Sequence, residues 1–331
     1  MEPLSLEAIR TTSLFDRPSK VAARDLAKPW VAGGRLKDFL ACLPAQLAAK
    51  DLVEAVQAVA DAVWDGRTVL LGMGAHPIKV GLAPVIIDAM ESGILKGVAL
   101  NGAGVIHDVE MALAGKTSED VGAHLSLGRF GMARETAEFI NGAVSRPGNV
   151  GRVGFGEAVG RALLEADPPY ARFSILSAAA RLGIPVTVHV AMGTDIIHMH
   201  PSMDGAAAGA ASHLDFRIFC RLVSNLRKGV YINLGSAVVL PEVFLKAVSV
   251  AANLGYDLSG LTTLNMDFMR HYRPQVNVVE RPTAGKGRGF SLVGHHEILF
   301  PLFCAALKEA LADKGGPAPA GAPPDSTGEA S

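Results

Sequence analysis

The stretch DLVEAVQAVADAVWDGRTVLLGMGAHPIKVG (residues 51–81) decides the fold. Its first part carries apolar residues at helical spacing and stops at Gly66, which predicts a helix beginning at Asp51. The run TVLLGM (68–73) is short and continuously apolar, as expected of a strand buried on both faces of a sheet. A second helical pattern covers 79–92. The stretch therefore predicts a helix, a buried strand and another helix.

The same alternation recurs along the chain. Further strands are predicted at 97–101, 185–191, 230–235 and 261–266. Further helices are predicted at about 105–114, 132–142, 155–165, 173–182, 213–227, 241–254 and 296–313. Because strands that alternate with helices need crossover connections, we expect an α/β fold: a Rossmann-like parallel sheet with helices on both faces, in a single domain.

Three regions differ in composition and periodicity. Residues 1–35 have weak periodicity and several proline and glycine breakers, so we expect an N-terminal arm that packs on the domain or on a neighbouring subunit. Residues 36–313 contain no internal repeat and no linker, which indicates one domain. Residues 314–331 are rich in Pro, Gly and Ala and have no apolar face, which predicts a disordered tail.

Composition argues against several partners. Lys plus Arg (31) nearly balances Asp plus Glu (32) and no basic block is present, so we expect no nucleic-acid partner. No apolar run reaches the ~18 residues of a membrane span, and the first residues lack a signal-peptide pattern, so we expect a cytoplasmic protein without a membrane partner. Cys42, Cys220 and Cys304 are far apart and predict buried, reduced thiols.

Ligands of such sheets bind beyond the carboxyl ends of the strands. Gly72 and Gly74 follow the first strand, and glycine backbone beside a helix start can seat a pyrophosphate, although a tight structural turn explains them equally well. Other polar or glycine-rich segments lie just after predicted strands or shortly before the last predicted helix. They are NGAGVIHD (101–108), GTDIIHMHPSMDG (193–205), NMDFMRHYRP (265–274), RPTAGKGRG (281–289) and GHHE (294–297).

Histidines in the third of these segments raise the alternative of a metal site. His198 and His200 would share one face of an extended segment, with His189, Asp195 and Asp204 nearby. No HExxH pattern or cysteine ligand accompanies them, so we expect a ligand crevice and no metal. Lys286, in the segment AGKGRG, is interpreted as an anion clamp, an imine-forming amine or a solvated loop charge.

These segments resemble the deoxyhypusine synthase family over about residues 68–310. The family consists of tetramers of single-domain, Rossmann-like subunits that bind NAD and move the aminobutyl group of spermidine onto a lysine of a translation factor. The resemblance implies NAD as cofactor and a homo-oligomer, a tetramer as in the family. The implied cofactor-binding residues are Gly74, Ala75, His76, Gly102, Ala103, Gly104, Asp204, Gly205, Thr262, Thr263, His295 and His296.

The sequence departs from the family where the polyamine would bind. The family's imine-forming lysine corresponds to Pro282, its covering tryptophan to Glu280, and its His-His pair to Pro241 and Glu242. Proline has no primary amine, so we do not expect true hypusine formation. Lys286 is the candidate replacement for the missing lysine.

The predicted function is that of a deoxyhypusine synthase-like, NAD-dependent enzyme acting on a small amine, polyamine or amino acid through an imine. His107, His295 or Glu297 would take the amine proton, and Asp267 and Glu280 would hold the ammonium group. The predicted catalytic set is His107, Asp267, Glu280, Lys286 and Glu297. Alternatives are an ornithine-cyclodeaminase-like NAD enzyme, a catalytically inactive nucleotide-binding regulatory homologue and, last, a metal-dependent hydrolase.

Overall fold

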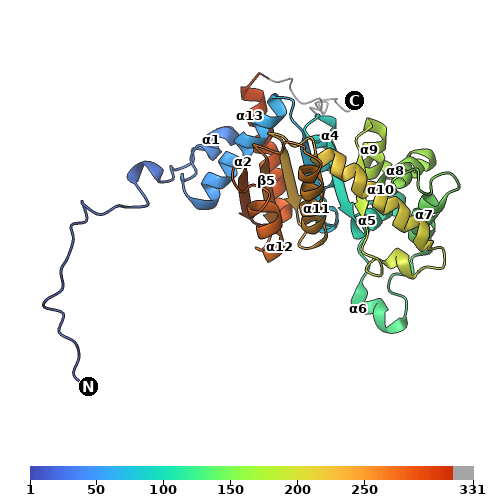
Figure 1. Cartoon of the computed structure of the whole chain (residues 1–331), viewed down its shortest axis with the longest axis horizontal. Helices are drawn as coiled ribbons and strands as arrows, with labels where there is room; N and C mark the ends of the chain where they lie inside the picture. Colours follow the sequence, from blue (N-terminus) through green and yellow to red (C-terminus); the bar gives the residue numbers. More distant parts are fainter. Residues whose placement is uncertain (316–331) are drawn as a thin grey trace, which may run out of the picture.

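One parallel sheet organises the chain (Figure 1). The structure is a computed structural model and describes residues 1–315; most of the predicted tail, 316–331, lies outside the described residues. The strands run in the order β3-β2-β1-β4-β5-β6. Their bounds are β1 (Val69–Met73), β2 (Gly97–Asn101), β3 (Val186–His189), β4 (Val230–Leu234), β5 (Thr262–Asp267) and β6 (Arg288–Val293). The predicted α/β, Rossmann-like fold is confirmed.

Helices cover both faces of this sheet, which buries the continuous apolar runs of its strands. Leu71 and Met73 of β1 belong to the apolar cluster on one face, whereas Leu70 and Tyr231 belong to the cluster on the other face. The main helices are α1 (Leu36–Leu40), α2 (Leu47–Trp64), α3 (His76–Lys79), α4 (Ala83–Glu91), α5 (Gly102–Ala114), α6 (Val121–His124), α7 (Arg134–Ser145), α8 (Phe155–Ala166), α9 (Ile175–Leu182), α10 (Gly205–Val223), α11 (Val239–Asn253), α12 (Tyr272–Pro274) and α13 (His296–Asp313).

Some elements differ from the sequence prediction for local reasons. The predicted helix 79–92 divides into α3 and α4 at Gly81, whose φ of 83° ends the first piece. Helix α10 starts at Gly205 rather than at 213, because the Asp204 side chain accepts a hydrogen bond from the N–H of Ala207 (3.0 Å) and caps it. Strand β6 was not predicted; it is a partly exposed edge strand preceded by glycines.

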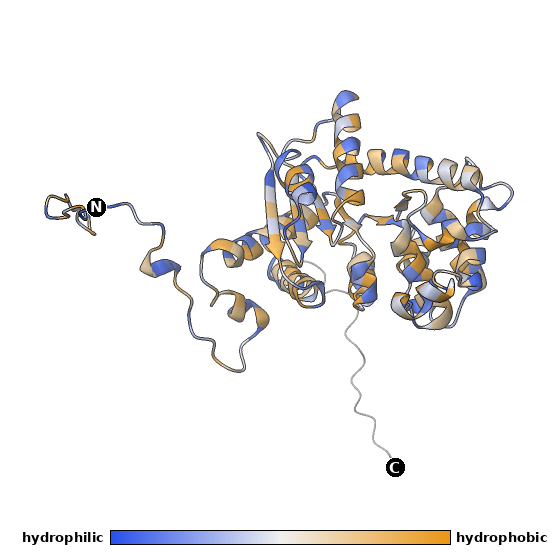
Figure 2. Cartoon of the chain, turned by 90° about the horizontal axis from the view of Figure 1, so that it is seen from below, coloured by the Kyte–Doolittle hydropathy of each residue, from blue (hydrophilic) through white to orange (hydrophobic). Residues whose placement is uncertain are grey.

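The N-terminal arm extends away from the sheet domain (Figures 1 and 2). Its large apolar side chains are exposed in this chain, among them Leu14, Phe15 and Val31. Apolar side chains left uncovered in this number are typical of a segment that packs on another surface. The division of the chain at residue 35, and the partner of the arm, stay predictions. In residues 1–315, no helix is long and apolar enough to cross a membrane.

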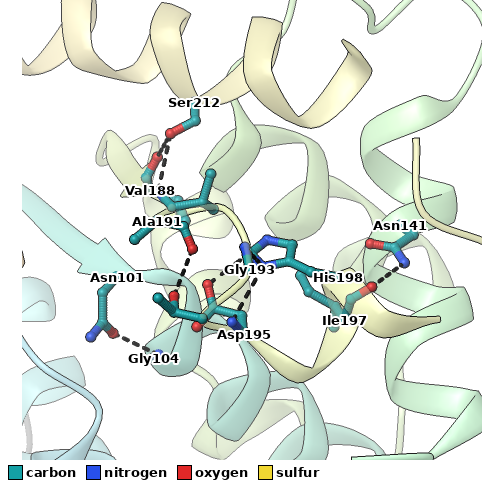
Figure 3. Close-up of polar contacts among 12 residues, drawn as sticks. Asn101, Gly104, Asn141, Val188, Ala191, Gly193, Asp195, Ile197, His198 and Ser212 are labelled. Carbon is teal, nitrogen blue, oxygen red and sulfur yellow. Dashed lines mark hydrogen bonds and ion pairs between the residues drawn. The ribbon is translucent and has the colours of Figure 1, made fainter. Parts of the chain in front are cut away.

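The outer edge of β3 is closed by side chains of α10. Asp215 Oδ2 accepts hydrogen bonds from the N–H of Val188 (2.7 Å) and from the N–H of Gly156 (3.0 Å). The hydroxyl of Ser212 donates to the carbonyl of Val188 (2.9 Å) and accepts from the N–H of Val190 (3.2 Å; Figure 3 shows the Val188 contact). An open strand edge exposes unpaired backbone groups, and here one helix satisfies them.

Candidate functional site

The strand order places the candidate site between β1 and β4. Strand β1 leads toward β2 on one side of the sheet, and β4 leads toward β5 on the other. Their carboxyl ends therefore meet at the topological switch point, where ligands of open α/β sheets bind. Gly74–His76, which follow β1, and Gly235, which follows β4, meet at this point.

The two strand-end loops approach so closely that glycine is required. The N–H of Gly74 donates to the carbonyl of Leu234 (3.1 Å), and a Cβ at Gly74 would lie 2.3 Å from the carbonyl oxygen of Gly235. Gly235 has a φ of 62°, and a Cβ there would lie 2.9 Å from Nε2 of His296. The loops thus form a compact floor, with the first residue of α13 against it.

His296 is the most unusual polar group of this site. His296 is 1% exposed, and neither its Nδ1 nor its Nε2 has a hydrogen-bond partner. Its Nε2 lies 3.6 Å from Oδ1 of Asp267, the last residue of β5, which is 2% exposed and accepts a hydrogen bond from the N–H of Phe268 (2.8 Å). Buried polar atoms without partners are rare in proteins and call for a functional explanation.

Aromatic rings connect His296 to the surface. The ring of His76 lies 5.3 Å from that of His296 and 6.0 Å from that of Phe268, and the Phe268 and His296 rings are 5.8 Å apart. His76 and Phe268 are both exposed. His295 and Glu297 flank His296 at the start of α13, with His295 Nδ1 3.9 Å from Glu297 Oε1, and both side chains are largely open to solvent. These side chains therefore extend from the buried imidazole of His296 to the solvent-exposed surface.

Burial lowers the pKa of His296, because the charged imidazolium loses its hydration. The His76 ring acts in the same direction, and the carboxylate of Asp267 opposes both. The balance is a pKa below the ordinary value of 6.5, so His296 is a neutral imidazole near pH 7. A neutral imidazole with free nitrogens is able to accept a proton.

A pocket of about 220 Å³ lies beside this site, at the carboxyl ends of β2 and β3. His107 lines it; its Nδ1 lies 2.6 Å from the hydroxyl of Thr117, which in turn donates to Glu110 (2.5 Å). Charged and polar side chains dominate the lining. They are Lys79, His107, Glu110, Ser118, Glu119, Thr194 and Asp195.

The structure brings together part of the predicted cofactor set. Gly74, Ala75 and His76 lie at the end of β1, and Gly102, Ala103 and Gly104 form the first turn of α5, where Asn101 Oδ1 accepts from the N–H of Gly104 (2.9 Å; Figure 3). His295 and His296 begin α13. Asp204 and Gly205 start α10, where Asp204 is exposed and serves as the helix cap. Their contact with NAD stays a prediction.

Four predicted residues lie elsewhere. Thr262 and Thr263 are the first two residues of β5, within the strand predicted at 261–266. Lys286 and Glu280 precede β6, where the N–H of Arg288 donates to the carbonyl of Leu261 (3.0 Å). Thr262, Thr263 and Lys286 sit at the amino edge of the sheet, because a parallel strand carries its first residues to the edge opposite its last. Lys286 therefore lies away from the switch-point site, as does the nearby Pro282, and its replacement of the family's lysine stays a prediction.

Two polar residues of the 193–205 segment, which the sequence analysis named beside a ligand crevice, have buried side chains. His198 Nδ1 accepts hydrogen bonds from the N–H groups of Gly193 (3.1 Å) and Asp195 (3.2 Å), as Figure 3 shows. Asp195 is 8% exposed, and its Oδ2 has no hydrogen-bond partner. The sequence analysis weighed the GTDIIHMHP cluster as a metal site and favoured a ligand crevice. In residues 1–315, no group of three or more His, Cys, Asp or Glu is placed to hold a metal ion.

Asp108, by contrast, has a structural role. It is fully buried and accepts hydrogen bonds from the hydroxyl of Ser174 (2.5 Å) and from the N–H groups of Ile175 (2.7 Å) and Leu176 (3.1 Å). These are the first residues of α9, so Asp108 caps that helix from α5. Burial raises the pKa of Asp108 to about 6, against the effect of these hydrogen bonds.

Known proteins share the architecture of the chain. Its sequence matches no protein-family model and no curated protein. The ternary complex of AgrE with ornithine and NAD⁺ is similar in structure, with a TM-score of 0.50 at 13% identity over 80% of this chain and 34% of AgrE. A putative deoxyhypusine synthase from Entamoeba histolytica gives 0.49 at 10% identity, over 85% of this chain and 95% of that protein. A conserved putative LOR/SDH protein from Methanococcus maripaludis S2 gives 0.49 at 14% identity, over 80% and 70%.

These likenesses are at the level of the fold. All three identities are far below those that relate functions, and the chain spans about a third of the length of AgrE. The fold is shared with AgrE, which was solved in complex with ornithine and NAD⁺; the reaction has to be argued from the site itself.

Proposed function

We propose that the protein binds NAD at the switch point between β1 and β4 and oxidises a small amine or amino acid at the carbon that bears nitrogen. The observation that carries the proposal is His296: a buried, neutral imidazole with both nitrogens unpaired, 3.6 Å from the carboxylate of Asp267. The shared fold with the NAD⁺ and ornithine complex of AgrE supports the choice of cofactor and substrate class.

The residues present fit a dinucleotide. Gly74 and Gly235 keep the strand ends free of side chains, which allows close approach to backbone. Ala75 and His76 open α3, and the first N–H groups of a helix have no helical acceptor and can donate to phosphate oxygens. The pocket beside α5 offers space for the adenosine half. NAD, when bound, would supply a hydride acceptor.

The chain's own groups would handle the substrate and its proton. Asp267 would hold an ammonium group and orient His296 through Nε2. His296 would take the proton that the amine must lose before the carbon is oxidised, because it is neutral near pH 7. Phe268 and His76 would limit the access of water to the imine product. Water then attacks the imine, which gives ammonia and a carbonyl compound.

The test is NAD binding by calorimetry, followed by NADH formation measured by absorbance with a panel of amines and amino acids that includes ornithine. We expect binding in the wild type and NADH with at least one substrate. His296→Gln should reduce turnover by about 10²–10⁴-fold with intact binding. His213→Gln, which changes an exposed histidine of α10, is the matched control and should behave as wild type. Absence of NAD binding in the wild type would refute the proposal.

Binding without NADH formation on any substrate would leave the cofactor site in place and refute the catalytic part. The inactive regulatory homologue would then be the better description. Mass spectrometry of the denatured, freshly purified protein gives an independent check, since a bound nucleotide would be released and identified by its mass.

A further inference from the structure

Asp195 brings a buried carboxylate to the carboxyl end of β2, although it belongs to the segment after β3. Its Oδ2 lies against Gly102, the first residue after β2: a Cβ at Gly102 would be only 2.0 Å from this oxygen. Asp195 is 8% exposed, lines the pocket beside α5, and leaves Oδ2 without a hydrogen-bond partner. Buried acceptors in proteins usually have a hydrogen-bond donor. Because Oδ2 has none and Asp195 lines a pocket, we expect a bound ligand to provide the donor.

The position matters because of the strand order. In sheets of the order 3-2-1-4-5-6, an acidic residue at the end of the second strand accepts a hydrogen bond from a ribose hydroxyl of the bound dinucleotide. Here β2 ends with Asn101, whose side chain is already used to cap α5 through the N–H of Gly104 (2.9 Å). No acid of β2 itself is available there, and Asp195 reaches the same place from the neighbouring strand.

His198 keeps this carboxylate in place. Its Nδ1 accepts from the N–H groups of Gly193 and Asp195, so the ring proton is on Nε2, and Nε2 lies 3.9 Å from Oδ2 of Asp195. The Nε2 atom also has no hydrogen-bond partner. A donor and an acceptor that both lack partners match a hydroxyl, which both accepts and donates.

We infer that Asp195 selects the nucleotide: its carboxylate accepts a hydrogen bond from the adenosine ribose of NAD and repels the 2′-phosphate of NADP, and His198 is its positioning residue. This rests on the proposed function. Other charges of the pocket act in the same sense, because Glu110 and Glu119 line it as well. Lys79 is exposed at the pocket and would attract a phosphate. The three carboxylates of Asp195, Glu110 and Glu119 outnumber this one ammonium group.

The experiment compares the affinities of NAD and NADP by calorimetry on the full chain. We expect the wild type to prefer NAD by at least about tenfold, and Asp195→Asn to lower this preference by about tenfold or more, since the charge is lost and the shape kept. Asp167→Asn, an exposed acid beyond α8, is the matched control and should keep the wild-type preference. Asp204 is the other carboxylate that the sequence analysis implied as an NAD contact, so Asp204→Asn tests whether it sets the preference instead. Asparagine is also a good helix cap, so the start of α10 should be retained.

A second variant keeps the inference testable if Asp195→Asn fails to fold. Gly102→Ala retains the charge but places a Cβ where Oδ2 now lies, so it should weaken NAD binding by displacing the carboxylate. An unchanged preference in folded Asp195→Asn, or a change in Asp204→Asn alone, would overturn the inference, while NAD binding by the wild type would leave the proposed cofactor site standing. Failure of the wild type to bind either dinucleotide would overturn both.

Discussion

Replacing Asp215 with alanine should destabilise the protein by removing the acceptor that closes the edge of β3. Two buried N–H groups, of Val188 and Gly156, would lose their partner. Each such loss costs about 1–3 kcal/mol, which gives about 2–6 kcal/mol in total. A pocket of about 330 Å³ beside Asp215 admits water to the vacated space, so we expect the lower half of this range, about 2–4 kcal/mol.

The assay is urea unfolding followed by far-ultraviolet circular dichroism, with hydrogen exchange of the Val188 amide as a local readout. Ser212→Ala is the matched comparison on the same helix: it removes neutral hydrogen bonds to the same strand and should cost only about 0.5–1.5 kcal/mol. A loss below about 1 kcal/mol for Asp215→Ala, or equal losses for the two variants, would refute the reasoning.

The same residue makes stability depend on pH. Burial raises the pKa of Asp215 from 3.8 to about 7, so the folded protein binds a proton that the unfolded chain has released between these values. Stability should therefore fall as pH rises from about 4 to about 7, by up to about 4 kcal/mol from this group alone. Asp215→Asn should flatten this slope. Burial also raises the pKa of Asp108, to about 6, so this residue likewise lowers stability as pH rises. Part of the pH dependence should therefore remain in Asp215→Asn.

The remaining predictions concern activity and assembly. The acid limb of the pH–rate profile should give a pKa below 6.5 for His296, and Asp267→Asn should lower it further, because the carboxylate stabilises the imidazolium; a limb above 6.5 would contradict this. Light scattering should give a homo-oligomer, a tetramer of about four times the 34.5 kDa chain, and a monomer mass would contradict this prediction. With NAD, labelled spermidine and the translation factor, we expect no label on the factor and no borohydride-trapped adduct on Lys286, which lies at the amino edge of the sheet; label on the factor would overturn the reasoning.

Much of the fold could be predicted because long apolar runs and helical periodicity are local signals. The strands β1, β2, β4 and β5 came within one or two residues of their predicted bounds. Strand β6 could not be found this way, since RGFSLV is half exposed and follows glycines. Edge strands have no second sheet neighbour, so they need not be continuously apolar, and the periodicity that identifies the buried strands is absent there.

The candidate site was predicted in part. Asp267 and His296 were both chosen from the sequence, but their contact across β5 and α13 needs the tertiary structure. Thr262 and Thr263, which the resemblance implies as NAD contacts, are the first residues of β5 and so lie at the edge of the sheet opposite the switch point; their contact with NAD stays a prediction. Asp195 was named from the sequence as part of a polar segment, but its packing against Gly102, which is distant in sequence, needs the tertiary structure.

The separation of Lys286 from the site has a practical consequence for handling the molecule. Residues 281–287 lie at the amino edge of the sheet, and β6 carries the chain about 20 Å from there to the carboxyl edge. A label or surface tether introduced at position 286 would point away from the crevice. Protein immobilised through it would present the crevice to the solution in one orientation, which suits surface-based measurements of ligand arrival and departure.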